Sequence, residues 1–162
     1  MNKKIASFFI ISLSICHVAN ANVSESETQI REVVEKFRVS IINKDKAVFE
    51  SLFYSESIPF IAVFSEEMLK AKREERADYP ATVDFGKFGP PSKMLLGNDA
   101  LEEKIWNVNV QTDGYLASVH FDYSDHENGK MRAKGTESWS MVKHGEDWKI
   151  TSISFTVTQV NQ

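Results

Sequence analysis

One carboxylate stands out among the side chains that could carry chemistry in this sequence. Glu137 lies in the segment GTESWSM, where strand alternation places it on the same face as Trp139 and Met141. A carboxyl group on an apolar face loses contact with water, which raises its pKa and suits it to act as an acid, a base or a polar anchor. The alternative is a hydrated position, or an ion pair with Arg132 or Lys134. Glu137 is therefore the best candidate for a catalytic residue.

The other polar candidates carry weaker signals. His120 and Asp122 share the more polar face of the strand predicted at residues 115–123, whereas Tyr123 lies on its apolar face, so the pair is expected to point outward. Two more histidines fall in predicted turns, which leaves no metal-ligand spacing. The segment SWSMV lacks the glycines of a nucleophile elbow, and no phosphate-binding glycine loop occurs. We therefore expect neither a metal ion nor a cofactor.

Large aromatic side chains indicate a second kind of site, an apolar pocket for a small molecule. The residues expected to bind that molecule are Tyr54, Phe60, Trp106, Tyr123, Glu137 and Trp139. The alternative is that the aromatic residues simply form the core, where such side chains are more often found.

The first 21 residues have the parts of a secretory signal peptide. Two lysines precede an apolar run that ends at Cys16, and Ala19-Asn20-Ala21 forms a small-x-small cleavage site. The run is too short for a membrane anchor, which needs roughly 20 apolar residues. A lipoprotein signal at Cys16 is disfavoured because the preceding Ile15 is bulky. We expect cleavage after Ala21 and a periplasmic or secreted product that is not embedded in the membrane.

Cleavage would change the composition of the chain. It would remove the only cysteine and two lysines, leaving 17 basic side chains (19 less Lys3 and Lys4) against 23 acidic ones. The mature protein, residues 22–162, would then have no disulfide, and its length fits a single domain with its own core. The acidic balance and the lack of a basic patch argue against nucleic-acid binding.

Helices are predicted in the first half of the mature chain. Apolar residues at three-and-four spacing predict a helix with Thr28 as N-cap that ends at the sequence NKD, residues 43–45. Its buried stripe would be Ile30, Val33, Val34, Phe37, Ile41 and Ile42. Residues 22–27 are polar and expected to be frayed. A second helix is predicted from Asp45, and a charged helix after the cap Ser65.

Residues 79–97 contain three prolines and three glycines, which predicts a long loop with no regular structure. Such a loop is either a lid over a binding site or an ordinary surface connection. A short helix capped by Asn98 or Asp99 is predicted to follow it.

Strands are predicted at residues 57–64 and throughout the C-terminal third. Asp113-Gly114 and Asn128-Gly129 are strong hairpin signals between segments rich in β-branched and aromatic residues. Helices followed by an antiparallel meander indicate the α+β class, with the helices on one face of a curved antiparallel sheet.

Several motifs in this order resemble the nuclear transport factor 2-like superfamily, which includes polyketide-cyclase-like, ketosteroid-isomerase-like and lumazine-binding types. They are GNDAL, DGYLASV and WSMVKHGEDWKI, and the resemblance covers most of residues 28–158. It implies a cone-shaped sheet wrapped around the N-terminal helices, with an apolar pocket at the open end. It also implies a homodimer formed through the outer face of the sheet. A ketosteroid-isomerase-like base is not expected, because the strand at 57–64 contains no Asp or Glu.

The last predicted strand changes the parity of its apolar residues. Trp148 and Ile150 are even-numbered, whereas Ile153, Phe155 and Val157 are odd-numbered. A strand with one buried face keeps one parity unless an extra residue is inserted as a β-bulge. We therefore predict a bulge or sharp bend near Thr151-Ser152.

Three functions remain open at this point. The first is binding of an unknown small apolar or amphipathic molecule in the pocket, without catalysis. The second is a cofactor-free isomerase or dehydratase that uses Glu137. The third is protein–protein contact, which predicts an apolar patch on the outer face of the sheet, with at least about 1,000 Å² buried in total.

Overall fold

The computed structural model describes residues 14–160, and it describes side chains from residue 24 onward. The helices are α1 (Ser14–Asn43), α2 (Lys46–Ser51) and α3 (Glu66–Glu75), with short 3-10 helices η1 (Phe85–Phe88) and η2 (Pro91–Leu95). The strands are β1 (Phe60–Phe64), β2 (Thr82–Asp84), β3 (Leu101–Thr112), β4 (Leu116–Glu127), β5 (Lys130–His144) and β6 (Asp147–Gln159). Most of the predicted signal peptide lies outside the described residues.

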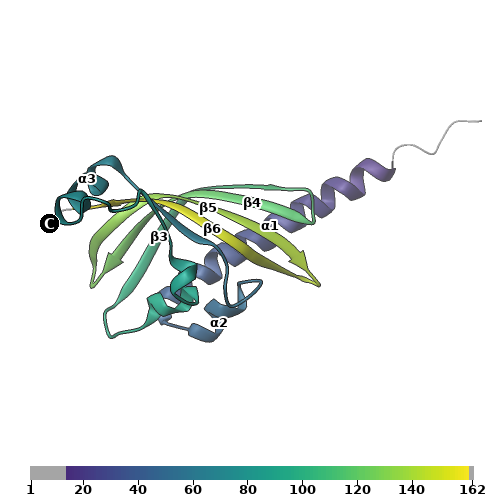
Figure 1. The fold of residues 1–162 in the computed structure, drawn as a ribbon. Helices are drawn as coiled ribbons and strands as arrows, with labels where there is room; N and C mark the ends of the chain where they lie inside the picture. Colours follow the sequence, from purple (N-terminus) through teal and green to yellow (C-terminus); the bar gives the residue numbers. More distant parts are fainter. Residues whose placement is uncertain (1–13, 161–162) are drawn as a thin grey trace, which may run out of the picture.

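A single curved sheet covers the first two helices (Figure 1). The strand order is β2-β1-β6-β5-β4-β3, and the long strands β3 to β6 form the predicted antiparallel meander. β1 pairs with β6 in parallel, which makes the sheet mixed. The α+β class and the cone-shaped sheet wrapped around N-terminal helices are confirmed.

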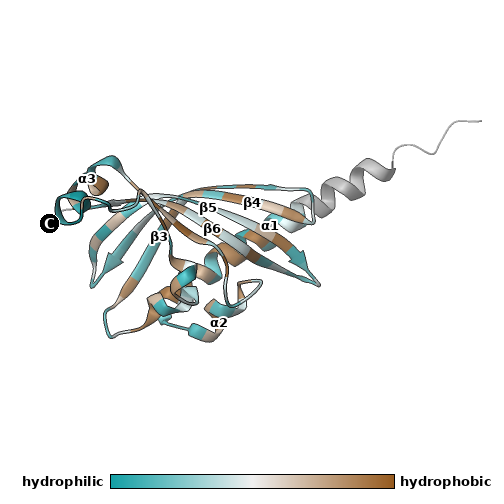
Figure 2. Cartoon of the chain, viewed as in Figure 1, coloured by the Kyte–Doolittle hydropathy of each residue, from teal (hydrophilic) through white to brown (hydrophobic). Residues whose placement is uncertain are grey.

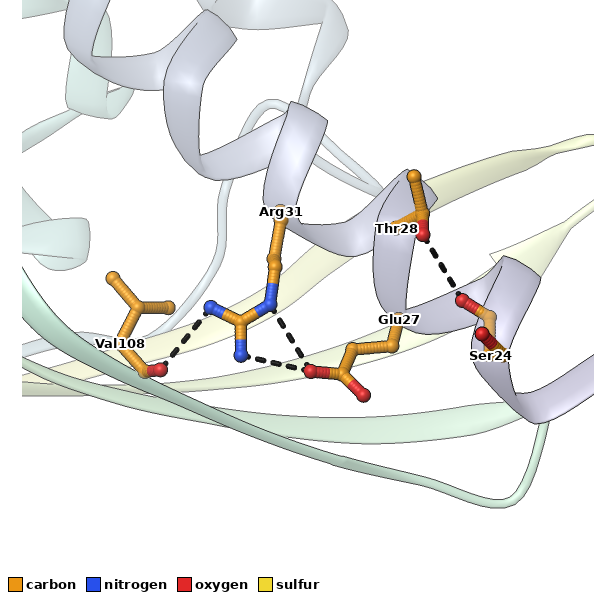
Figure 3. A network of polar contacts seen from close by, with 5 residues as sticks. All are labelled: Ser24, Glu27, Thr28, Arg31 and Val108. Carbon is orange, nitrogen blue, oxygen red and sulfur yellow. Dashed lines mark hydrogen bonds and ion pairs between the residues drawn. The ribbon is translucent and has the colours of Figure 1, made fainter.

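The helix α1 is longer than predicted and extends beyond the sheet at its N-terminal end (Figure 1). Thr28 is not its N-cap, and residues 22–27 are helical rather than frayed. The Thr28 hydroxyl instead donates to the Ser24 carbonyl oxygen at 3.1 Å, one turn earlier (Figure 3). A threonine inside a helix commonly bonds back in this way, so its presence alone does not mark a helix start.

The remaining helix boundaries agree better with the sequence. Lys44 has a positive φ of 53° and ends α1, while the Asp45 carboxylate accepts from the Val48 backbone N–H at 3.0 Å and caps α2. Ser65 caps α3 through the Met68 N–H at 3.3 Å. The buried face of α1 is as predicted except for Ile42, which is exposed.

Two predictions for the middle of the chain are wrong. The segment 79–97 contains β2, η1 and η2 rather than an irregular loop. Residues 98–100 are not helical, and β3 begins at Leu101. The segment that begins at Leu101 joins the sheet because ten of its residues pair with β4. Such pairing overrides the modest helix propensity of Leu, Glu and Lys.

The predicted bulge is confirmed at Thr151. Ser140 of β5 pairs with Ser152, but the next residue, Met141, pairs with Ile150, so Thr151 is the extra residue. Its hydroxyl donates to the Ser140 carbonyl oxygen at 3.0 Å. Because of this insertion, Ile150 before the bulge and Ile153 after it are both fully buried.

The main core lies between α1, α2 and the concave face of the sheet, where hydrophobic residues gather (Figure 2). Arg31 links α1 to the irregular part of β3, where the pairing with β4 shifts register between Trp106 and Asn109. One of its guanidinium nitrogens donates to the Val108 carbonyl oxygen at 3.2 Å, while two others contact Glu27 (Figure 3). Within the described residues, no helix has the length and hydrophobicity to cross a membrane.

Candidate functional site

A cavity of about 390 Å³ lies inside the curve of the sheet. Its apolar walls come from α1, β1, β6 and the segment that carries η1 and η2. The apolar residues that line it are Phe37, Phe60, Phe85, Phe88, Pro90, Pro91, Met94 and Phe155. Its polar lining side chains are Lys93, Glu103, Tyr123, Asp125 and Glu137.

Three carboxyl groups reach this cavity from three neighbouring strands. Glu103 of β3 pairs directly with Asp125 of β4 in the sheet register. Glu137 of β5 pairs with Phe121, four residues before Asp125 on β4. Glu103 and Glu137 are each only 4% exposed, and Asp125 is half-buried. The alternative that Glu137 pairs with Arg132 does not hold, because Arg132 contacts Glu127 at 2.9 Å.

Burial raises the pKa of all three carboxyl groups. It raises the pKa of Glu137 to about 8, against the opposing effect of the hydrogen bond from Trp139. Burial also raises the pKa of Asp125 to about 6. The pKa of Glu103 is raised well above its ordinary value, first by burial and then by the nearby charges of Glu137 and Asp125. Burial therefore favours the neutral, protonated forms of Glu103 and Glu137.

The hydrogen bonding of this cluster is incomplete. Glu137 Oε1 accepts from the indole Nε1 of Trp139. Glu103 Oε1 is buried and has no hydrogen-bond partner. Within residues 24–160, none of the three carboxyl groups takes part in an ion pair. The described residues also contain no group of three or more His, Cys, Asp or Glu side chains arranged to hold a metal ion.

Tyr123 lies beside the carboxyl groups, and its hydroxyl hydrogen is already used in a hydrogen bond to the backbone. It pairs with Gly135 on β5, and a Cβ atom at Gly135 would lie 1.9 Å from the Thr156 carbonyl oxygen. That close approach of β5 and β6 requires glycine, and the Tyr123 hydroxyl donates to the same carbonyl oxygen at 2.9 Å. Burial and the neighbouring carboxyl groups raise the pKa of Tyr123, so the phenol stays protonated.

The segment over the cavity is anchored at both ends. Asp84 accepts from the backbone N–H groups of Phe60 and Gly86, each at 3.1 Å, which fixes η1 against β1. The Ser92 hydroxyl donates to Glu50 at 2.6 Å, which fixes η2 against α2. Between these anchors the aromatic ring of Phe88 is 66% exposed, although Phe88 also lines the cavity.

The structure brings together some of the predicted site residues but not others. Phe60, Tyr123 and Glu137 line the cavity. Trp139 lies behind it, packed between Phe37 and Phe121, and its indole Nε1 donates to Glu137. Tyr54 and Trp106 lie outside it: Tyr54 is 57% exposed and packs edge-on against His144, and Trp106 is 44% exposed.

Sequence reasoning missed Glu103 and Asp125. Both obey the strand alternation that identified Glu137, since Asp125 follows Phe121 and Tyr123 at two-residue spacing and Glu103 precedes Ile105. Asp125 was missed because the predicted strand stopped at residue 123. Glu103 was missed because residues 98–106 were predicted to form a short helix. His120, as predicted, lies on the outer face, where its Nδ1 contacts the Ser138 hydroxyl at 2.7 Å.

No family model matches this sequence, and no curated protein sequence matches it either. Solved structures do resemble it. A nuclear transport factor 2-like protein with a cystatin-like fold from Novosphingobium aromaticivorans superposes with a TM-score of 0.62 at 11% identity, over 87% of each chain. A provisional scytalone dehydratase from the same organism gives 0.60 at 11% identity, over 86% of this chain and 88% of that one.

A third neighbour, from Nostoc punctiforme, is a protein of unknown function with a cystatin-like fold. It superposes with a TM-score of 0.56 at 11% identity, over 82% of this chain and 90% of its own. These matches extend over nearly the whole described chain. The strand order and the enclosed helices agree with the fold that the sequence motifs indicated. The chain has the nuclear transport factor 2-like fold.

Proposed function

We propose that this chain binds a small, largely apolar molecule inside the curve of its sheet. The cavity itself carries the proposal. Its volume of about 390 Å³ falls within the range of roughly 300–1,000 Å³ usual for small-molecule sites. Such sites combine apolar walls with a few polar groups, and here phenylalanines and carboxyl groups line the same cavity.

Native mass spectrometry of protein purified from the organism that makes it tests this function. We expect a noncovalent adduct that is lost on denaturation. Phe60→Ala is expected to lower the retained fraction severalfold, because Phe60 lines the cavity and packs against Phe155. Tyr54→Ala is the matched control, since it removes an exposed aromatic ring outside the cavity. Absence of any adduct, or equal loss from both variants, would contradict the proposal.

We also propose that the domain acts outside the cytoplasm after cleavage following Ala21. The packed part of α1 is compatible with this position, because Ser26 is the first buried side chain among those described. The same mass spectrum is expected to show a chain that begins at Asn22 and is assembled as a homodimer. A mass that retains residues 1–21 would contradict the cleavage site, and a monomer mass would contradict the dimer.

A second function, acid–base catalysis without a cofactor, is favoured by one observation. Glu137, with a pKa raised to about 8, and Asp125, with a pKa raised to about 6, are neighbouring carboxyl groups that burial protonates to different degrees. Such a difference suits one group to act as an acid and the other as a base. An enzyme would convert the molecule that it binds, so recovery of an unaltered adduct after incubation supports binding alone.

Protein–protein contact through the sheet has less support. Hydroxyl side chains and His120 occupy the central part of the outer face, including Ser118, Ser138, Ser140 and Ser154, which are all exposed. The central part of this face is therefore polar, whereas this function requires an apolar patch.

A further inference from the structure

The protein leaves part of the hydrogen-bonding capacity at the polar end of the cavity unused. Trp139 Nε1 donates to Glu137, but Glu103 Oε1 has no hydrogen-bond partner although Glu103 is only 4% exposed. The Tyr123 hydroxyl already donates to the Thr156 carbonyl oxygen. A buried polar atom without a partner is unfavourable, so a ligand that forms a hydrogen bond with it gains binding energy.

The titratable groups around the cavity favour a cationic ligand. Glu103, Asp125, Glu137 and Tyr123 are the titratable groups that the sheet presents, whereas α1 and β6 contribute only Phe37 and Phe155. Lys93 of η2 is the cationic side chain among the lining residues, but it is exposed and its ammonium group donates to the Phe88 carbonyl oxygen. A cation placed among the carboxyl groups would therefore meet no positive charge from the sheet or from α1.

The size and lining of the cavity favour an organic cation over a metal ion. The carboxyl groups do not converge as a metal site among the described residues. Five phenylalanine rings instead line the space beside them. Ring faces attract ammonium groups, and the rings also cover an attached hydrocarbon chain.

We propose that the ligand is an amphipathic amine, whose ammonium group is bound at Glu103 within the carboxyl cluster and whose apolar part lies against the phenylalanines. This proposal rests on the proposed binding function. An ammonium group supplies up to three N–H donors to the carboxyl cluster, including the unpartnered Glu103 Oε1. Burial favours protonated Glu103 and Glu137 when the cavity is free, so binding of the amine releases protons to solvent.

Three probes of similar shape test the ligand class by isothermal titration calorimetry: phenylbutylamine, phenylbutanol and phenylbutyrate. The amine is expected to bind at least about tenfold more tightly than the alcohol, because its donors are charged. The carboxylate is expected to bind most weakly. Amine affinity should rise between about pH 6 and about pH 8 as the carboxyl groups lose protons, since a primary amine stays charged in this range. The heat of amine binding should change with the ionisation enthalpy of the buffer.

Variants of two adjacent residues give a matched control. Glu103→Gln is expected to weaken binding of the amine about tenfold and to leave binding of the alcohol within about twofold. Glu102→Gln should change neither, because Glu102 lies on the opposite face of β3, where its carboxylate is 3.9 Å from the Lys104 ammonium. If Glu103→Gln does not fold, the comparison of the three probes on the unaltered protein still decides the question.

The outcomes separate the two proposals. If none of the three probes binds, the binding function itself fails. If the alcohol or the carboxylate binds as tightly as the amine, the cavity is a binding site but the ligand class is wrong. Tighter amine binding that is unaffected by Glu103→Gln would place the ammonium group elsewhere and overturn the assignment of the carboxyl cluster.

Discussion

Glu137→Gln is expected to stabilise the protein at pH 8 and to change its stability little at pH 5. Folding raises the pKa of this carboxyl group to about 8, compared with about 4.3 in the unfolded chain. The folded state therefore holds the proton more tightly. The stability that this proton provides is fully present below about pH 4 and is lost as the pH rises through the folded pKa. By linkage, the loss is of the order of 3–5 kcal/mol.

Glutamine removes that loss with little change in structure. It has nearly the shape of the protonated acid, and its Oε1 can still accept the hydrogen bond from Trp139 Nε1. The variant should therefore have a flatter dependence of stability on pH than the unaltered protein. A rise in the thermal midpoint of several degrees at pH 8 follows from a gain of this size in a domain of about 140 residues.

Urea unfolding between pH 5 and pH 9 measures the effect directly. Glu146→Gln is the control, because Glu146 is an exposed residue in the turn between β5 and β6. Its stability should follow that of the unaltered protein at each pH. Parallel curves for the unaltered protein and Glu137→Gln would mean that Glu137 titrates as an ordinary surface carboxylate, and the description of the cavity as a desolvated acid cluster would be wrong.

The carboxyl group predicted from the sequence is the one that lies within a regular alternation of buried and exposed strand residues. Glu137 was identified because Trp139 and Met141 follow it at two-residue spacing, and all three are buried. The same rule applies to Asp125, but the turn residues that follow it made the strand seem to end at residue 123. Strand ends are set by pairing with a neighbouring strand, and that pairing is not encoded within one segment.

The location of the predicted aromatic residues shows a second limit. Phe60 lines the cavity and Trp106 does not, although both lie in strands rich in apolar residues. Trp106 directly precedes the irregular part of β3, where Asn107 has a positive φ of 54°. The segment over the cavity is a similar case. Its prolines and glycines predicted breaks in regular structure, but the hydrogen bonds of Asp84 and Ser92 that hold it over the cavity are long-range contacts.

Deletion of Thr151 is expected to prevent the domain from folding. The deletion removes the bulge and makes β6 regular, so the residues that follow would exchange faces. Ile153 and Val157, which are now buried, would point outward. Burial of each such side chain contributes about 1.5–3 kcal/mol, and a domain has only about 5–15 kcal/mol in total. The exchange would also move Phe155 away from the cavity and disturb the parallel pairing of β6 with β1.

Thr151→Ala tests the side chain of the inserted residue separately from the insertion itself. It keeps the extra residue and removes only the hydrogen bond from the threonine hydroxyl to the Ser140 carbonyl oxygen, so its cost should be about 1 kcal/mol. Circular dichroism and urea unfolding of both variants measure the difference. A deletion variant that folds with nearly unchanged stability would show that β6 can shift its register along β5. In that case the parity change in the sequence would not be the feature that fixes which side chains of β6 face the cavity.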